Sequence, residues 1–353
     1  MEQQKVIIAR QLEAELSAAI EACRPDRLMV LVDETTQRLC LPLVAGYDCL
    51  RGAQVITIGA GDTNKTLDSL VHVWSELQRM GATRHSLLVS LGGGMVTDLG
   101  GFAASTFKRG ISLINIPTTL LAMVDASVGG KTGINFGGLK NEVGVFRNAS
   151  AVILDTTFLK TMDRENLLSG YAEMLKHGLI SPVTTEKNML AELLTFDIEQ
   201  PDLGVLQQMI ADSVAVKQRI VTEDPTEQGL RKALNLGHTV GHAFESLALE
   251  RRPVLHGYAV AWGLVCELYL SVVKTGFPVD RMRQVARFVF DHYGRMPITC
   301  DDYPALLQLM THDKKNTAGR INFSLISDVG QLCLDQTATQ QEIEEALDFY
   351  REN

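Results

Sequence analysis

Short apolar runs that end in polar or glycine-rich turns recur through the first half of the chain. Residues 28–32, 55–58, 86–91 and 111–116 each have the length and composition of a buried β-strand. A helical pattern of apolar residues separates the second run from the third. Buried strands that alternate with helices predict an α/β domain with a Rossmann-like parallel sheet, so most of this half has little freedom to fold otherwise.

The second half of the chain has a different pattern. A further short strand is predicted at 152–154, and from about residue 163 helical spacing of apolar residues dominates to the C-terminus. With 353 residues the chain is too long for one ordinary core. We therefore predict two domains, an α/β domain over residues 1–163 and an all-α domain over residues 164–353.

Three consecutive glycines follow the third predicted strand, in Gly92-Gly-Gly-Met-Val-Thr-Asp98. Glycines between a buried strand and a helix allow backbone N–H groups to approach a phosphate at the helix N-terminus. The pattern matches neither the dinucleotide fingerprint nor the P-loop, and it also fits a tight turn. Its position after a strand favours a nucleotide-phosphate loop. Asp33, at the end of the first strand, fits either a helix cap or a ribose ligand.

A polar, glycine-rich segment covers residues 124–141 and contains Asp125, Lys131, Lys140 and Asn141. Such a segment makes a poor core, so we expect a flexible loop. Both lysines have small or apolar neighbours, which favours their convergence on an anion over random exposure.

Two histidines, His238 and His242, lie four residues apart in a segment with helical spacing. Side chains at positions i and i+4 of a helix share one face and can share a ligand. His256 and Glu173 supply further donors elsewhere in the second half. Two histidines and one carboxylate form a donor set typical of catalytic zinc, although a histidine pair on a helix also occurs without a metal.

Composition excludes several classes of function. The net charge of −9 and pI of about 5.4 argue against nucleic-acid binding, which needs a basic face. The six cysteines are scattered without a paired spacing, which indicates reduced thiols. The N-terminus lacks the pattern of a signal peptide, and we expect no apolar run long enough to cross a membrane. A cytoplasmic protein is predicted.

Several longer motifs, in this order, resemble those of the dehydroquinate synthase family within the sugar phosphate cyclases. The matching stretches are Ser90-Leu-Gly-Gly-Gly-Met-Val-Thr-Asp-Leu-Gly-Gly, Ile116-Pro-Thr-Thr-Leu-Leu, Val124-Asp-Ala-Ser-Val-Gly-Gly-Lys-Thr-Gly, Ala172-Glu-Met-Leu-Lys-His-Gly and Asn235-Leu-Gly-His-Thr-Val-Gly-His. The resemblance covers nearly the whole chain. It departs from the family at Thr97, Leu139 and Tyr258.

The resemblance implies roles for particular residues, with the active site between an NAD-binding α/β domain and a helical metal- and substrate-binding domain. The implied metal ligands are Glu173, His238 and His256, with His242 beside them, either supporting a ligand or acting in catalysis. The implied NAD-binding residues are Asp33, Asp62, Lys65, Gly93, Gly94, Asp98, Thr118, Thr119, Lys131, Lys140, Phe158 and Thr161. The implied catalytic and substrate-binding residues are Asp125, Lys131, Asn141, Lys176, Lys217, Arg231, Asn235, His242 and either Lys314 or Lys315.

The activity that the resemblance implies converts 3-deoxy-D-arabino-heptulosonate 7-phosphate to 3-dehydroquinate and phosphate. The implied sequence is NAD-dependent oxidation, phosphate elimination, re-reduction, ring opening and aldol closure, with zinc or cobalt as the metal and a homodimer as the assembly. The many cations in the chain suit a substrate with a phosphate and a carboxylate. Three alternatives stay open: another sugar phosphate cyclase, an NAD- and metal-dependent polyol dehydrogenase, and a non-catalytic NAD-binding module.

Overall fold

The computed structural model describes residues 4–311 and 321–353. Its packing divides the chain into two compact units, neither of which is one continuous segment. The first unit contains Met1–Asp163 and Asp202–Val214, and the second contains Arg164–Pro201 and Ala215–Asn353. The predicted boundary treated residues 164–353 as one block, whereas the structure assigns 202–214 to the first unit. Gln207 shows the attachment, because its side-chain amide donates to the carbonyl of Ala9 over 2.7 Å.

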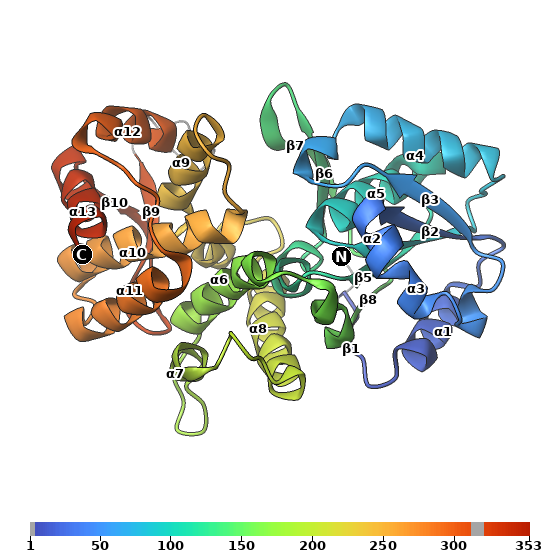
Figure 1. Cartoon of the computed structure of the whole chain (residues 1–353), viewed down its shortest axis with the longest axis horizontal. Helices are drawn as coiled ribbons and strands as arrows, with labels where there is room; N and C mark the ends of the chain where they lie inside the picture. Colours follow the sequence, from blue (N-terminus) through green and yellow to red (C-terminus); the bar gives the residue numbers. More distant parts are fainter. Residues whose placement is uncertain (1–3, 312–320) are drawn as a thin grey trace. The chain divides into compact units, whose positions relative to one another are not determined.

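A six-stranded parallel sheet forms the centre of the first unit (Figure 1). Its strands, in spatial order, are β1 (Val6–Ile8), β8 (Ala151–Leu154), β5 (Ser112–Pro117), β4 (Leu87–Gly92), β2 (Leu28–Asp33) and β3 (Gln54–Ile58). The α/β class and the five strands predicted from apolar runs are confirmed, and β1 is an additional edge strand. The central strand β4 is buried throughout, as a strand covered on both faces should be.

Helices connect the parallel strands and bring their carboxyl ends to one edge. The helices of this unit are α1 (Leu12–Cys23), α2 (Glu34–Leu39), α3 (Leu41–Val44), α4 (Leu67–Arg79) and α5 (Gly94–Thr106). The chain runs from β2 outward to β3 and then back to β4. Right-handed crossovers in opposite directions place helices on opposite faces of the sheet. The segments that follow β2, β4 and β5 therefore meet at one edge, where nucleotides bind in such sheets.

The glycine-rich segment is not the loop that we expected. It forms a π-helical turn, Ala122–Ala126, followed by the antiparallel hairpin of β6 (Lys131–Phe136) and β7 (Leu139–Phe146). Gly137 and Gly138, at φ of 60° and 82°, supply the left-handed conformations that a tight hairpin turn requires. These two glycines lie in the segment that was predicted to be flexible, although a Gly-Gly pair between two strands is a turn signal.

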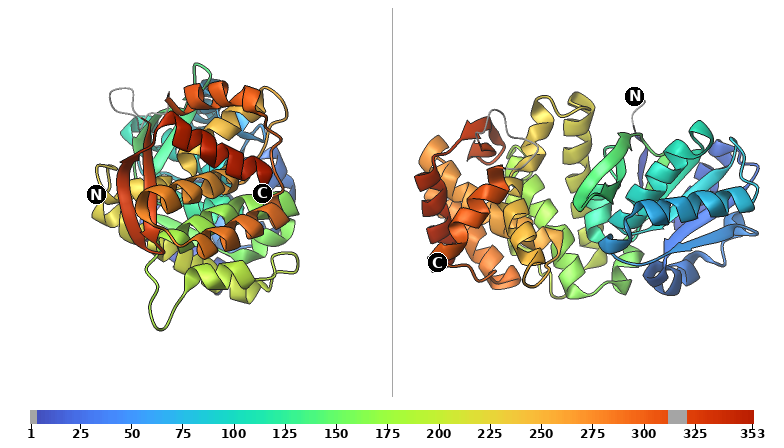
Figure 2. Two further views of the ribbon diagram at one scale, coloured as in Figure 1. Left: turned by 90° about the vertical axis from the view of Figure 1, so that its left-hand side faces the viewer. Right: turned by 90° about the horizontal axis from the view of Figure 1, so that it is seen from above.

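The second unit is mainly helical. Its helices are α6 (Arg164–Ile180), α7 (Met189–Thr195), α9 (His238–Leu249), α10 (His256–Thr275), α11 (Val279–Tyr293), α12 (Tyr303–Thr311) and α13 (Gln340–Glu352). Helix α8 (Leu203–Glu223) contributes residues to both units. An antiparallel pair, β9 (Asn322–Asp328) and β10 (Gln331–Thr337), packs against α10 and was not predicted (Figure 2). The helical class of this domain is nevertheless confirmed.

Helix α10 is the centre of this unit and packs against α6, α9, α11 and α13. By length and composition it could cross a membrane, contrary to our expectation that no apolar run was long enough. However, 72% of its apolar window is buried inside the structure, as in the core helix of a globular domain. Its hydrophobicity is therefore explained by packing.

Glycines allow α9 and α10 to approach each other closely. A Cβ on Gly263 would lie 2.0 Å from the carbonyl oxygen of Gly237, and one on Gly241 would lie 2.9 Å from that of Ala259. Gly237, which precedes α9, also has a φ of 80° that other residues rarely adopt. The absence of these side chains sets the separation of the two helices that carry the histidines.

Candidate active site

Glu173 lies at the centre of a polar cluster inside the second unit. It is part of α6, and its side chain is completely buried. The ammonium group of Lys176, one turn further along α6, forms an ion pair with its carboxylate. Burying a carboxylate costs free energy unless charged or hydrogen-bonding groups surround it. The residues around Glu173 must therefore compensate for its burial.

Two histidines face the same oxygen of Glu173. His238 Nε2 lies 3.4 Å from Glu173 Oε1, and His256 Nε2 lies 3.5 Å from it. His238 is the first residue of α9 and His256 is the first residue of α10. His242 joins them, since one donor atom from each of the three histidines lies within 4.8 Å of the others. The structure thus brings the predicted ligands and His242 together.

The other ring nitrogen of each facing histidine has a polar partner. His238 Nδ1 lies 3.1 Å from the carbonyl oxygen of Leu236, and His256 Nδ1 lies 3.2 Å from Glu245 Oε2. Both partner oxygens accept hydrogen bonds, so each Nδ1 carries the proton and donates it. In both rings Nε2 is the nitrogen that faces Glu173.

The two histidines differ in charge. Burial, together with the positive charge of Lys176, lowers the pKa of His238 to about 3. Burial also opposes a charge on His256, but hydrogen bonds to Glu173 and Glu245 outweigh it and raise the pKa to about 10. Glu173 itself is buried, which favours its neutral form, yet the charge of Lys176 holds its pKa well below the usual range. The carboxylate is therefore ionised at neutral pH.

Three cations predicted to hold substrate are buried in this unit. Lys176, Lys217 and Arg231 are exposed by 1%, 6% and 2% respectively, far less than is usual for charged side chains. A turn fixes the backbone around Arg231, because the Asp224 carboxylate accepts hydrogen bonds from three backbone N–H groups, including that of Arg231. The side-chain amide of Asn235 donates a hydrogen bond of 2.8 Å to Glu227 Oε1 in the same turn. Lys314 and Lys315 lie outside the described residues.

In the first unit, the predicted phosphate loop forms the N-terminus of α5. Gly93 is the N-cap residue, so no side chain caps the first N–H groups of this helix. A Cβ on Gly93 would lie 3.1 Å from the side chain of Thr119, and one on Gly94 would lie 3.1 Å from that of Ala126. The glycines therefore leave backbone N–H groups accessible at a helix N-terminus on the carboxyl edge of the sheet, where a pyrophosphate fits.

Asp33 caps helix α2, which confirms one of the two roles that the sequence allowed for it. Its Oδ1 accepts a hydrogen bond of 2.7 Å from the backbone N–H of Thr36, and the two residues form a capping box at α2. Asp33 also ends β2, beside the other strand ends of the sheet. Its predicted contact with a ribose remains a prediction.

A buried lysine links two groups of predicted site residues. Lys65, exposed by 3%, donates to Asp98 Oδ2 and to Asn141 Oδ1, each over 2.5 Å. The backbone N–H of Asn141 donates to the side-chain oxygen of Asn135 in the hairpin, and the Asn135 amide donates to Asp62. This network joins the hairpin to the loop that contains Lys65.

The two lysines of the hairpin lie at opposite ends of the strand pair. Lys131 is opposite Phe146 at one end of the β6–β7 pair, whereas Lys140 follows the turn at the other end. About four residues of strand, roughly 13 Å, separate these positions. Lys140 instead lies 3.6 Å from Asp62. The segment forms a regular hairpin and not the loop that we expected, and the convergence of its lysines on an anion stays a prediction.

The remaining predicted residues of the first unit lie in the segments that follow β5 and β8. Thr118 follows β5, and its backbone N–H donates to the carbonyl of Gly92 over 3.0 Å. Asp125 is in the π-helical turn and is partly buried. Phe158 is buried, and Thr161 donates to its carbonyl over 2.7 Å. All three segments belong to the first unit.

Two buried carboxylates, Glu245 and Glu267, were not among the predicted site residues. Glu245 accepts a hydrogen bond from His256, and it lies seven residues after His238 on the same face of α9. Glu267 of α10 accepts hydrogen bonds from the backbone N–H groups of Gly237 and Val240, at 2.7 and 3.0 Å, and so caps the start of α9. A signal for Glu267 was available, namely one acidic residue inside a continuous apolar run.

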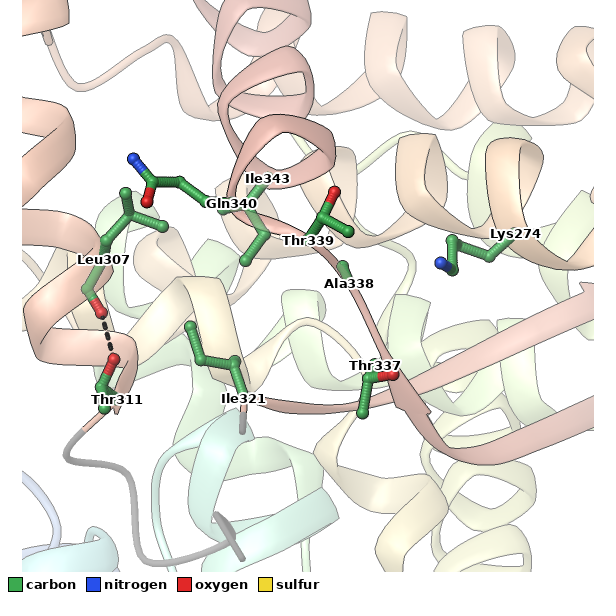
Figure 3. A pocket seen from close by; sticks show the side chains of 9 residues that line it. All are labelled: Lys274, Leu307, Thr311, Ile321, Thr337, Ala338, Thr339, Gln340 and Ile343. Atoms are coloured by element: carbon green, nitrogen blue, oxygen red, sulfur yellow. Dashed lines mark hydrogen bonds between the residues drawn. The ribbon is translucent and has the colours of Figure 1, made fainter. Parts of the chain in front are cut away.

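A cavity of about 390 Å³ also lies in the second unit, between α12, β10 and α13 (Figure 3). Leu307, Ile321, Ile343 and the end of Lys274 contribute to its wall. None of the predicted site residues lines it among the residues that the structure describes. The buried polar cluster is therefore the better candidate for chemistry.

The donor set at Glu173 fits a divalent metal. One carboxylate oxygen and two imidazole nitrogens already face one another, and the rings of His238 and His256 have centroids 5.4 Å apart. Nitrogen and oxygen donors of this kind suit zinc and leave a coordination position for substrate. His242, with its ring centroid 5.3 Å from that of His238, stands beside this set.

Solved structures of enzymes share this architecture. The 2-epi-5-epi-valiolone synthase of Streptomyces hygroscopicus, solved with NAD+ and Zn2+, has a TM-score of 0.85 and 26% identity, covering 100% of this chain and 98% of that one. A 2-deoxy-scyllo-inosose synthase also has a TM-score of 0.85, at 23% identity over 98% of this chain and 96% of that one, which supports the fold alone. The fold of this chain is the one that these sugar phosphate cyclases share.

Family comparisons define the chain more closely. The 3-dehydroquinate synthase N-terminal model matches residues 55–169, and the C-terminal model matches residues 170–316. The 3-dehydroquinate synthase of Parabacteroides distasonis is 52% identical over 354 residues, covering 100% of this chain and 99% of that protein. That of Pyrococcus furiosus is 38% identical, covering 93% of this chain and 95% of that protein. The chain belongs to the 3-dehydroquinate synthase family, as its motifs predicted.

Proposed function

We propose that the protein converts 3-deoxy-D-arabino-heptulosonate 7-phosphate to 3-dehydroquinate and phosphate, with NAD as a catalytic cofactor and a divalent metal. The observation that carries this proposal is the buried cluster in which Glu173 faces His238, His256 and Lys176. The cluster places a metal-type donor set and a buried cation together, as oxidation of a substrate hydroxyl beside anionic groups requires.

In this proposal, Glu173, His238 and His256 hold zinc, or alternatively cobalt. A bound divalent metal supplies a Lewis acid that lowers the pKa of a coordinated hydroxyl. His242 lies beside the donor set and accepts or passes on the hydroxyl proton. Lys176 adds a fixed positive charge that stabilises negative charge as it develops on substrate oxygen.

Residues 1–163 form the NAD-binding domain in this proposal. The N-terminus of α5, with Gly93 and Gly94, binds the pyrophosphate, and Lys65 and Asp98 help to shape the site. NAD supplies a hydride acceptor that later returns the hydride, so the cofactor is not consumed. The other residues assigned to NAD are Asp33, Asp62, Thr118, Thr119, Lys131, Lys140, Phe158 and Thr161.

Residues 164–353 bind the metal and, together with residues of the hairpin segment, the substrate. Buried cations suit a substrate that has both a phosphate and a carboxylate, because each charge-assisted hydrogen bond orients one anionic group. Oxidation next to the reacting carbon acidifies a C–H bond, and the substrate's own phosphate serves as the base. The residues assigned to substrate are Asp125, Lys131, Asn141, Lys176, Lys217, Arg231, Asn235, His242 and Lys314 or Lys315.

The assembly and setting are also part of the proposal. We expect a homodimer in the cytoplasm that binds neither nucleic acid nor membrane. Its net charge of −9 supports the first exclusion, and the burial of α10 supports the second. Sedimentation equilibrium of the purified chain measures the assembly directly, and a monomer at all concentrations would contradict it.

The test of function measures phosphate release from the heptulosonate phosphate with NAD+ and zinc, while absorbance at 340 nm is followed in the same cuvette. We expect phosphate release without net NADH, and 3-dehydroquinate as the product. Arg231→Ala should lose substrate binding, whereas Arg287→Ala, on the exposed face of α11, serves as a matched control.

Two other outcomes would replace the proposal. Absence of phosphate release, with turnover of another sugar phosphate, would identify a different cyclase; the likeness to the valiolone synthase makes its substrate the first to try. Accumulating NADH would identify a polyol dehydrogenase, a reaction for which glycerol dehydrogenase structures offer a more distant likeness in fold, at a TM-score of 0.67 for the Schizosaccharomyces pombe enzyme.

A further inference from the structure

The two proposed histidine ligands are held in different ways. His238 Nδ1 faces a backbone carbonyl, a neutral acceptor within its own helix start, at 3.1 Å. His256 Nδ1 faces the Glu245 carboxylate, a charged acceptor on a different helix, at 3.2 Å. Only the second contact can be changed by substituting a side chain, so the structure offers a direct way to test it.

The position of Glu245 is fixed by packing. Its side chain is exposed by 9%, and α9 is held against α10 by the glycine contacts at Gly241 and Gly263. His256 begins α10, so the contact joins the two helices at the proposed metal site. The same ring presents its Nε2 to Glu173 at 3.5 Å. The His256 ring therefore contacts Glu245 through Nδ1 and presents Nε2 to the proposed metal site.

We infer that Glu245 is a positioning residue that fixes His256 with its proton on Nδ1 and thereby sets the affinity of the metal site. A carboxylate that accepts from Nδ1–H directs the Nε2 lone pair towards the metal and makes it a more basic donor. The inference rests on the proposed function, because it takes His256 as a ligand. It assigns Glu245 no contact with substrate.

The test compares zinc affinities of the full-length chain and its variants by competition with a chromophoric chelator, without substrate. Glu245→Ala removes the acceptor, and we expect zinc affinity to fall about 10- to 100-fold. Glu245→Gln retains an oxygen that can accept from Nδ1–H but loses the charge, so we expect a loss near the lower end of this range. Glu250→Gln, at the exposed end of α9, should bind zinc like the unmodified chain.

Two readouts separate positioning from a structural role. The visible spectrum of the cobalt-loaded Glu245→Ala variant should shift, because the donor strength of His256 changes. Saturating zinc should restore most of kcat in this variant, because Glu245 does not touch substrate. If Glu245→Ala fails to fold, the isosteric Glu245→Gln supplies the result.

Unchanged zinc affinity in whichever variant folds would overturn the inference. If the unmodified chain itself binds no stoichiometric zinc, the metal assignment in the proposed function fails as well. If the unmodified chain binds zinc and Glu245→Ala binds it equally well, only the role of Glu245 is lost.

Discussion

The polar cluster around Glu173 in the second unit and the β6–β7 hairpin of the first unit differ in how far their polar side chains are buried. Glu173 is completely buried, and helices hold each residue around it. Every residue of β7 is exposed, and the hairpin is joined to its unit partly through Lys65 and Asn135. Substitution in the cluster should therefore affect stability and chemistry together, whereas substitution in the hairpin should mainly affect binding.

The largest effect is expected from Glu173→Gln. This change removes one proposed ligand and leaves Lys176 buried without its counter-charge. Breaking a buried ion pair costs about 3–5 kcal/mol, so the melting temperature should fall while zinc binding and turnover are lost. Metal content per chain and scanning calorimetry measure both.

The control for Glu173→Gln is Glu199→Gln, which breaks a half-exposed pair with Arg164. Such a pair contributes about 1 kcal/mol or less, so stability and zinc content should hardly change. Stoichiometric zinc in Glu173→Gln would remove the residue from the metal site and abolish the contrast between the regions.

A smaller effect, confined to cofactor binding, is expected from Lys65→Met. The change removes the two charge-assisted hydrogen bonds to Asp98 and Asn141. Their loss releases the loop that contains Lys65 from the hairpin, so NAD affinity measured by calorimetric titration should fall about tenfold, while zinc affinity is kept. Lys232→Met, which breaks a pair with Asp335 in the second unit, should leave NAD affinity unchanged. Equal NAD binding by Lys65→Met would contradict the proposed cofactor site.

Glycine substitutions test the difference in packing. Gly263→Ala would place a Cβ 2.0 Å from a backbone oxygen between α9 and α10, and overpacking of this kind costs about 1–3 kcal/mol or more. Gly137→Ala at the hairpin turn meets no atom within 4 Å, and only its φ of +60° opposes the change, at about 1–2 kcal/mol. Gly46→Ala, in open space, is the neutral control. Urea midpoints that fail to rank Gly263→Ala as the most damaging would show that the helix contact can relax.

The smallest effect is expected at Asp26, far from both groups of site residues in the sequence. Hydrogen bonds from Thr83 and Ser86 lower the pKa of its carboxyl. A lowered pKa in the folded state stabilises the protein above the unfolded pKa of about 3.9, and this contribution disappears as the pH falls through the folded pKa. Asp26→Asn should therefore reduce the pH dependence of the urea midpoint only in acid, and exposed Asp68→Asn is the control. An unchanged acid dependence in Asp26→Asn would contradict this.

Sequence patterns predicted the parts of the fold that depend on local apolar spacing. Five strands of the sheet and the helical second half follow from such spacing. The site residues came instead from the resemblance of longer motifs to a family. The hairpin was missed because Gly137 and Gly138 were interpreted as flexibility instead of a turn. The partners of His256 and Glu267 could not be predicted, because they depend on how α9 and α10 pack, which is set by contacts between residues distant in the chain.

The discontinuous first unit has a consequence for how the chain is made. Residues 202–214 belong to this unit, but α6 and α7 of the second unit precede them in the sequence. Domains generally fold as the ribosome releases them, starting from the N-terminus. Here the first unit lacks its last segment until the opening helices of the second have emerged. A fragment that ends at Asp163 would lack this segment and would leave the carbonyl of Ala9 without the hydrogen bond from Gln207.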